Sequence, residues 1–149
     1  MTALDSIYTA LYGWNTTWST DVQVHVWNYT DLDTSKKPAC PQRYLSPMLE
    51  ADSAFVLLGN TMSAEWSIED TLLIKPAGEG NPLKENAANI VKAINAYVEI
   101  VRANRAPTAQ SHIKEFSISP GVYYWPDSPE GGIGYVGVRF TLQIQEVIT

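Results

Sequence analysis

The two histidines, His25 and His112, are the residues of this chain best suited to acid–base or metal chemistry near neutral pH. Each stands alone in a strand-like run, and neither belongs to a spaced metal motif such as H-E-x-x-H. Ser-His-Asp catalysis would need a nucleophile elbow, and no G-x-S-x-G sequence is present. We therefore interpret both histidines as ordinary surface or half-buried side chains.

Two pairs of carboxylates could in principle share acid–base work, Glu50 with Asp52 and Glu69 with Asp70. Glu69 and Asp70 are adjacent, so in an extended segment they point to opposite faces and do not converge. We expect these carboxylates to be solvated turn charges.

Neither the glycine-rich stretches nor the single cysteine, Cys40, matches a known site motif. "GEG" and "EGGIG" have neither the spacing of a P-loop nor that of a dinucleotide fingerprint. With one cysteine, the chain has no internal disulfide and no cysteine-based zinc site. The sequence predicts no catalytic, metal or cofactor site.

Length and composition favour one globular domain over residues 1–149. Hydrophobic residues make up 45% of the chain and charged residues only 17%, a low charge that suits a protein packed against neighbours. The net charge is −6, and the basic residues are scattered, so direct binding to nucleic acid is not expected. An acidic surface can nevertheless line a passage through which DNA slides without sticking.

No targeting or membrane segment is expected. The start, "MTALDSIYTALYGW", lacks the basic and apolar regions of a signal peptide. No apolar run approaches the length of a membrane span. These features predict a protein that is made in the cytosol and has no membrane partner.

Two helices are predicted from apolar residues that recur every three or four positions. The first lies in the first dozen residues and ends at Gly13. The second spans 83–105 and is amphipathic, with Asn81 as its N-cap and Pro82 at its first position. Its expected core-facing stripe consists of Leu83, Ala87, Ile90, Val91, Ile94, Val98 and Val101.

Strands are predicted where polar and apolar residues alternate or where short apolar runs occur. The predicted strands are 21–29, 53–60, 65–76, 111–119 and 134–148. The last strand has one apolar face (Val136, Val138, Phe140, Leu142 and Ile144) and one nearly uncharged polar face. Together these elements predict an α+β fold, a mostly antiparallel sheet with the long helix and the short N-terminal helix packed on one face.

Residues 30–52 hold three prolines and several charges, which predicts a long loop. A second irregular segment, "WPDSPEGG", is expected to form the tip of a hairpin between the last two strands. Three consecutive aromatics precede it, Tyr123, Tyr124 and Trp125. In an extended segment Tyr123 and Trp125 share a face, so at least one of the three rings should be exposed as a contact surface. The alternative is that all three cover one end of the sheet.

The order of elements, the "PGVYYWP" hairpin and the closing strand "GYVGVRFTLQIQEVI" resemble those of tail terminator and tail-completion (neck) proteins of long-tailed bacteriophages and phage-like particles. The resemblance covers about residue 53 onward. It lies in the pattern of elements and polarity, with no catalytic motif to carry over. The long loop over 30–52 departs from the compact shape of that family.

The resemblance implies a structural virion protein of the tail or neck that is not an enzyme and is assembled in the host cytoplasm. Copies would form a hexameric ring that caps the tail tube, stops its polymerisation and docks the head connector in head–tail joining. Its partners would be itself, the tail-tube protein and the connector, with DNA passing through unbound. The candidate subunit or ring contacts are Tyr123, Tyr124, Trp125, Tyr135, Arg139 and Gln143.

Three other functions stay open. A different neck role, such as head closure or tail completion, would leave the same traces in the sequence. A small carbohydrate-binding module would use the abundant Trp and Tyr rings as stacking platforms and would be a stable monomer. A small enzyme would need a site built from His25, His112 and acidic residues, and the sequence offers no substrate for it.

Overall fold

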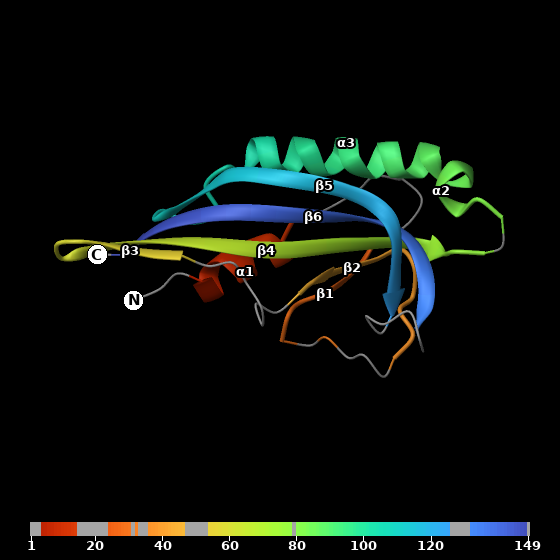
Figure 1. Cartoon of the computed structure of the whole chain (residues 1–149), viewed down its shortest axis with the longest axis horizontal. Helices are drawn as coiled ribbons and strands as arrows, with labels where there is room; N and C mark the ends of the chain where they lie inside the picture. Colours follow the sequence, from red (N-terminus) through yellow and green to blue (C-terminus); the bar gives the residue numbers. More distant parts are fainter. Residues whose placement is uncertain are drawn as a thin grey trace.

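A computed structural model describes residues 4–14, 24–30, 32, 36–46, 54–78, 80–125 and 132–148. These residues form a six-stranded sheet in the order β1-β2-β4-β6-β5, with β3 paired to β4 outside that path (Figure 1). The elements are α1 (Leu4–Tyr12), β1 (His25–Trp27), β2 (Gln42–Leu45), β3 (Ala54–Leu58), β4 (Thr61–Pro76), α2 (Pro82–Glu85), α3 (Ala87–Ala103), β5 (Ser111–Trp125) and β6 (Ile133–Ile148).

The predicted α+β class is confirmed: β1 and β2 are parallel, every other pairing is antiparallel, and both predicted helices are present. The long central strands β4 and β6 pair from Met62↔Ile148 to Pro76↔Tyr135, and β5 pairs with the other side of β6. Residues on one face of β6 are buried as their alternation predicts, namely Val136, Val138, Phe140, Leu142 and Ile144.

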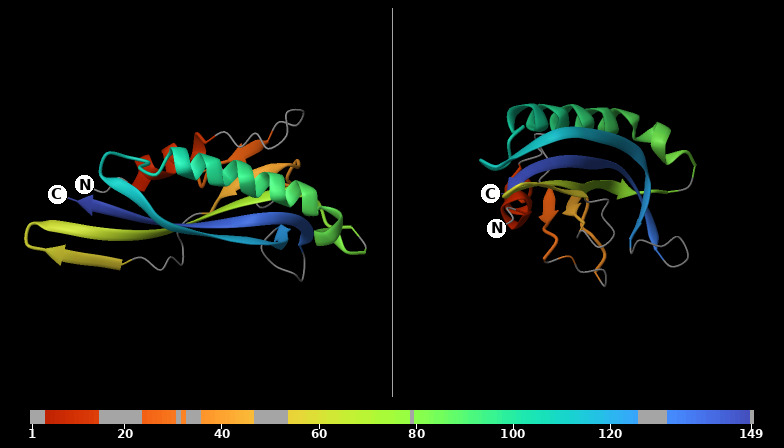
Figure 2. Two further views of the ribbon diagram at one scale, coloured as in Figure 1. Left: turned by 90° about the horizontal axis from the view of Figure 1, so that it is seen from above. Right: turned by 60° about the vertical axis from the view of Figure 1, so that its left-hand side comes forward.

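Both helices cover the same face of the sheet. Ile7 and Leu11 of α1 and Tyr97 of α3 belong to one core cluster with Ile68 and Phe140 of the sheet. The ring of Tyr97 stacks on that of Phe140, with centroids 3.7 Å apart and planes 3° from parallel. Figure 2 shows α3 running along the sheet, and no helix of the described residues lies on the opposite face, which we call the helix-free face.

The predicted helix over 83–105 is interrupted at Asn86, and its buried stripe differs from the predicted one. The Asn81 side chain caps α2 by accepting from the Lys84 backbone N–H, as expected. The buried residues of α3 are Ile90, Ala93, Tyr97 and Val101. Val91, predicted to face the core, is 55% exposed, because the stacking of Tyr97 sets the rotation of the helix.

The prediction of an unbroken loop over residues 30–52 is wrong. Residues Gln42–Leu45 form β2, which pairs with β4 over Leu45↔Asp70 to Gln42↔Leu73, and all four are buried. Within this range, residues 31, 33–35 and 47–52 lie outside the described residues. The strand predicted at 111–119 also continues to Trp125, through Pro120.

At one end the sheet curls until its two edges meet (Figures 1 and 2). The rings of Trp27 in β1 and Trp125 in β5 lie 5.3 Å apart, although these strands are at opposite ends of the strand order. Leu73 and Tyr135 pack between them on the face away from the helices, together with Tyr44. This second cluster, which we call the aromatic plug, closes one end of the helix-free face.

Candidate functional site

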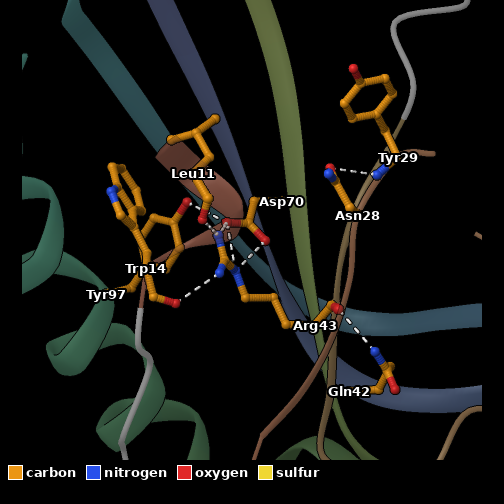
Figure 3. Close-up of polar contacts among 8 residues, drawn as sticks. All are labelled: Leu11, Trp14, Asn28, Tyr29, Gln42, Arg43, Asp70 and Tyr97. Carbon is orange, nitrogen blue, oxygen red and sulfur yellow. Dashed lines mark hydrogen bonds and ion pairs between the residues drawn. The ribbon is translucent and has the colours of Figure 1, made fainter. Parts of the chain in front are cut away.

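The most buried polar cluster of the described residues is built around Arg43 of β2 (Figure 3). Its guanidinium donates to both carboxylate oxygens of Asp70 at 2.7–2.9 Å. The same group donates to the backbone carbonyls of Leu11 at 2.5 Å and Trp14 at 3.0 Å. Tyr97 donates its hydroxyl to Asp70 at 2.8 Å. Arg43 thus ties β2 to β4, to α3 and to the C-terminal end of α1.

This cluster is structural. Arg43 and Asp70 are each 1% exposed, and the partners of their polar atoms are protein groups. Burial, and then the neighbouring Asp70 carboxylate, raise the pKa of Tyr97 well above its ordinary range, so its hydroxyl stays a neutral donor. Arg43 adds a second donor to the carbonyl of Leu11, which already accepts from the Trp14 N–H, and binds the carbonyl of Trp14 just beyond the end of α1.

The residues first considered for chemistry do not converge. His25 lies in β1 and His112 in β5, the two strands at opposite ends of the strand order. Glu69 and Asp70 point to opposite faces as predicted, although Asp70 is in a buried ion pair and is not the solvated charge expected. Glu50 and Asp52 lie outside the described residues. Among the residues described, no three His, Cys, Asp or Glu side chains gather as metal ligands.

Three of the candidate contact residues, Tyr123, Arg139 and Gln143, lie on the helix-free face of the sheet. Arg139 lies there, half-buried, with its Nε 3.0 Å from Oγ1 of Thr71 and 3.8 Å from a carboxylate oxygen of Glu69. Its guanidinium carbon stands 4.5 Å from the centre of the Tyr123 ring. Arg139 is thus engaged by a hydroxyl, a carboxylate and a ring within its own chain.

Beyond Arg139 the same face carries mostly Ser, Thr and Gln side chains, with Glu115 beside Gln143 and Glu65 beside Gln145. Gln143 donates to the Ser67 hydroxyl, and Gln145 donates to that of Ser63, each at 3.2 Å between β6 and β4. The cation at this end, Lys114, lies 2.9 Å from Glu65. We call this surface, from Ser63 to Arg139, the open polar face.

The three consecutive aromatic residues, Tyr123 to Trp125, do not share one role: some cover the end of the sheet and one is exposed. Trp125 is 6% exposed and donates its indole N–H to the Lys36 carbonyl at 2.7 Å, so it covers the end of the sheet. Tyr135, also a candidate contact, is fully buried beside it. These two residues are not available to a partner, which corrects their prediction as contacts. Tyr123 is half-buried against Arg139, and Tyr124 is exposed, as the alternation predicts for one of the three.

Sequence reasoning did not indicate two strongly exposed apolar side chains of β3. Val56 and Leu57 of β3 are 54% and 75% exposed, and they point to opposite faces of a two-stranded hairpin with β4. Val147, which is 42% exposed, pairs with Ser63, the partner of Val56. The apolar run over 53–60 predicted a strand correctly, but nothing local to it indicates that the hairpin projects beyond the sheet (Figure 1).

No protein-family model matches the chain, and no curated protein sequence matches it. Among the described residues, no helix is both long enough and apolar enough to cross a membrane.

Proposed function

We propose that this chain is a structural virion protein, a tail terminator of a long-tailed bacteriophage or phage-like particle. In this role copies of the chain form a hexameric ring that caps the tail tube and joins it to the head connector. The ring leaves a central passage for DNA. The proposal combines the resemblance in the pattern of elements with the chemistry of the open polar face.

The observation that carries the proposal is that the described residues of that face give it no excess of positive charge. A surface that DNA slides past must not exchange counterions for phosphates, because each Lys or Arg that meets a phosphate adds salt-dependent affinity. Arg139 and Lys114 on this face are each held by a carboxylate of the same chain, Glu69 and Glu65. The face otherwise carries Ser, Thr and Gln side chains, with Glu115 beside Gln143 and His112 beside Gln145. The carboxylates Glu65, Glu69 and Glu115 therefore outnumber the cations Lys114 and Arg139 on it.

The edges of the sheet supply a second argument. A ring is built from head-to-tail contacts, so each subunit needs two different surfaces that meet in neighbouring copies. One edge of this sheet is β5, whose residues are mostly exposed from His112 to Tyr124. The other side carries the projecting β3–β4 hairpin with exposed Val56 and Leu57. Unpaired strands and exposed apolar side chains are typical of surfaces that partners cover.

The direct test is assembly with the tail-tube protein of the same particle. Tubes grown in the presence of the chain should stop at a limited length and carry a ring at one end in electron micrographs. Tubes that elongate as they do without the chain, while the chain stays in the unbound fraction, would overturn the proposal. Rings that bind the head connector and leave tubes unaffected would instead assign the chain to head closure.

A variant pair tests the role of the open polar face. Gln143→Lys with Gln145→Lys places two unpaired cations on it, and Gln143→Glu with Gln145→Glu is the matched control of opposite charge. If the face lines the passage, the lysine variant retains DNA in assembled particles at low salt and the glutamate variant does not. Equal DNA retention by both would place the face outside the passage.

A further inference from the structure

The outer edge of β5 is the longest unpaired strand edge among the described residues. β5 runs over Ser111–Trp125 and pairs with β6 on one side, and no strand of the described residues pairs with its other side (Figure 1). An edge of this kind presents backbone N–H and C=O groups that can template pairing with another chain. Where each outward N–H of β5 goes therefore decides whether copies of the chain can join edge to edge.

The first outward N–H groups of β5 are satisfied within the chain. Residues of an antiparallel strand alternate between bonding the partner strand and pointing away from it. The N–H groups of Ser111 and Ile113 point away from β6 and donate to the carbonyls of Thr108 at 3.4 Å and Arg105 at 2.7 Å. The segment that precedes β5 thus covers the start of its outer edge.

Further along β5, a proline occupies an outward position. After a bulge near its start, β5 pairs with β6 without interruption to its end, and Pro120 lies inside this regular stretch opposite Val138. Proline has no N–H to give to a ladder, so within a sheet its nitrogen faces the free side of an edge strand. The other outward N–H groups of this stretch lie at alternate positions on either side of Pro120 and belong to Phe116, Ile118, Val122 and Tyr124.

The side chains at these outward positions make the edge prone to pairing. All four are apolar or aromatic, and Ile118 and Tyr124 are 36% and 38% exposed. The stretch from Phe116 to Trp125, "FSISPGVYYW", contains no charged residue that would repel another strand. Pro120 divides it into pieces of four and five residues. Both pieces are shorter than the segments of about six or seven residues that typically pair between chains.

We infer that Pro120 is an edge-blocking residue, which prevents β5 of one copy of this chain from pairing with β5 of a second copy. A second copy is the partner to exclude, because two identical uncharged stretches meet without charge repulsion. An approaching strand finds no donor at Pro120 and finds the donors of Ser111 and Ile113 already used. The inference does not rest on the proposed function, since side chains of β5 can still contact a neighbouring subunit.

Replacing Pro120 with valine tests the inference, because valine restores an outward N–H and favours a strand. Pro120→Val should form assemblies joined through β5, with a self-association constant about tenfold above that of the wild type, the effect of one added hydrogen bond. Analytical ultracentrifugation measures this constant. Ser119→Val is the matched control: it adds the same side chain at the neighbouring exposed position, whose N–H points to β6, and should behave like the wild type.

Hydrogen exchange shows whether the assemblies join at this edge. In the wild type, the outward amides of Ile118 and Val122 should exchange faster than those of Ser117 and Gly121, which point to β6. In the assemblies of Pro120→Val, the amides of Ile118 and Val122 should become protected. A Pro120→Val protein with the self-association of the wild type, or with these two amides still unprotected, would overturn the inference.

A second variant keeps the test decisive if Pro120→Val aggregates through misfolding. Adding Ile118→Lys to Pro120→Val places a charge on the outer edge, which should restore the mass distribution of the wild type. Assemblies that persist in the double variant do not depend on the β5 edge, and they would overturn the inference. Capping of tail tubes enters none of these outcomes, so the proposed function stands or fails by its own assay.

Discussion

Replacing Arg43 with Met is the sharpest perturbation of the fold that the structure offers. Methionine keeps much of the length and apolar volume of the stem but removes every N–H of the guanidinium. Asp70 then keeps only the hydroxyl of Tyr97 as its partner within the cluster. The carbonyls of Leu11 and Trp14 also lose the donor that Arg43 provides.

The expected loss is large relative to the stability of a domain of this size. Removing one partner of a buried ion pair costs about 3–5 kcal/mol, because the other charge stays buried without compensation. The pair here is 1% exposed on both sides, so solvent does not screen it. Against a typical free energy of unfolding of about 5–15 kcal/mol, Arg43→Met should leave the chain marginally folded.

Urea unfolding followed by circular dichroism measures the loss, and hydrogen exchange shows where it acts. The amides of α1 should lose protection first, because Arg43 binds the end of that helix. Arg102→Met is the control, since Arg102 pairs with Glu99 at 3.7 Å on the surface and both side chains are more than two-thirds exposed. It should cost about 0.5 kcal/mol or less. A loss below about 1 kcal/mol for Arg43→Met would refute the structural role of the cluster.

Three further predictions follow from buried groups. Tyr135 has a buried hydroxyl without a hydrogen-bond partner among the described residues, so Tyr135→Phe should raise the free energy of unfolding by about 1 kcal/mol. Tyr97→Phe should lower it, because the Tyr97 hydroxyl donates to Asp70. Burial raises the pKa of Tyr97 well above its ordinary value of 10.0, so above pH 10 the unfolded chain loses a proton that the native chain keeps. The free energy of unfolding, measured by urea titration, should therefore fall as the pH rises. The fall should be less steep in Tyr97→Phe. A Cβ at Gly137 would collide with a backbone carbonyl of β4, so Gly137→Ala should reduce soluble yield and melting temperature, and Gly78→Ala, which meets no atom within 4 Å, should not.

Patterns of nearby residues in the sequence correctly predicted the elements that depend on those residues alone. The alternation in β6, the first helix and the Asn81 cap follow from residues near one another in sequence. β2 was missed because prolines surround it and its pairing with β4 is long-range. The end predicted for β5 at 119 is wrong because β5 is an edge strand, where Pro120 can lack an N–H without breaking a ladder on both sides.

The candidate contact residues were likewise predicted only in part from the sequence. Alternation correctly placed Arg139 and Gln143 on the polar face of β6 and indicated that one aromatic of the triplet is exposed. It could not indicate that Trp125 meets Trp27, because that contact depends on the curl of the whole sheet. The exposure of Leu57 likewise depends on how far the β3–β4 hairpin extends past its neighbours.

The mass of the wild-type chain in solution, measured by light scattering over a wide range of concentrations, tests the central claim most directly. A chain that contacts its copies head to tail and closes into a ring should reach one discrete mass, that of a hexamer, and stay there as the concentration rises. Ring particles should then be visible in electron micrographs of the same sample. A monomer at every concentration, or a mass that keeps growing without limit, would contradict the closed ring.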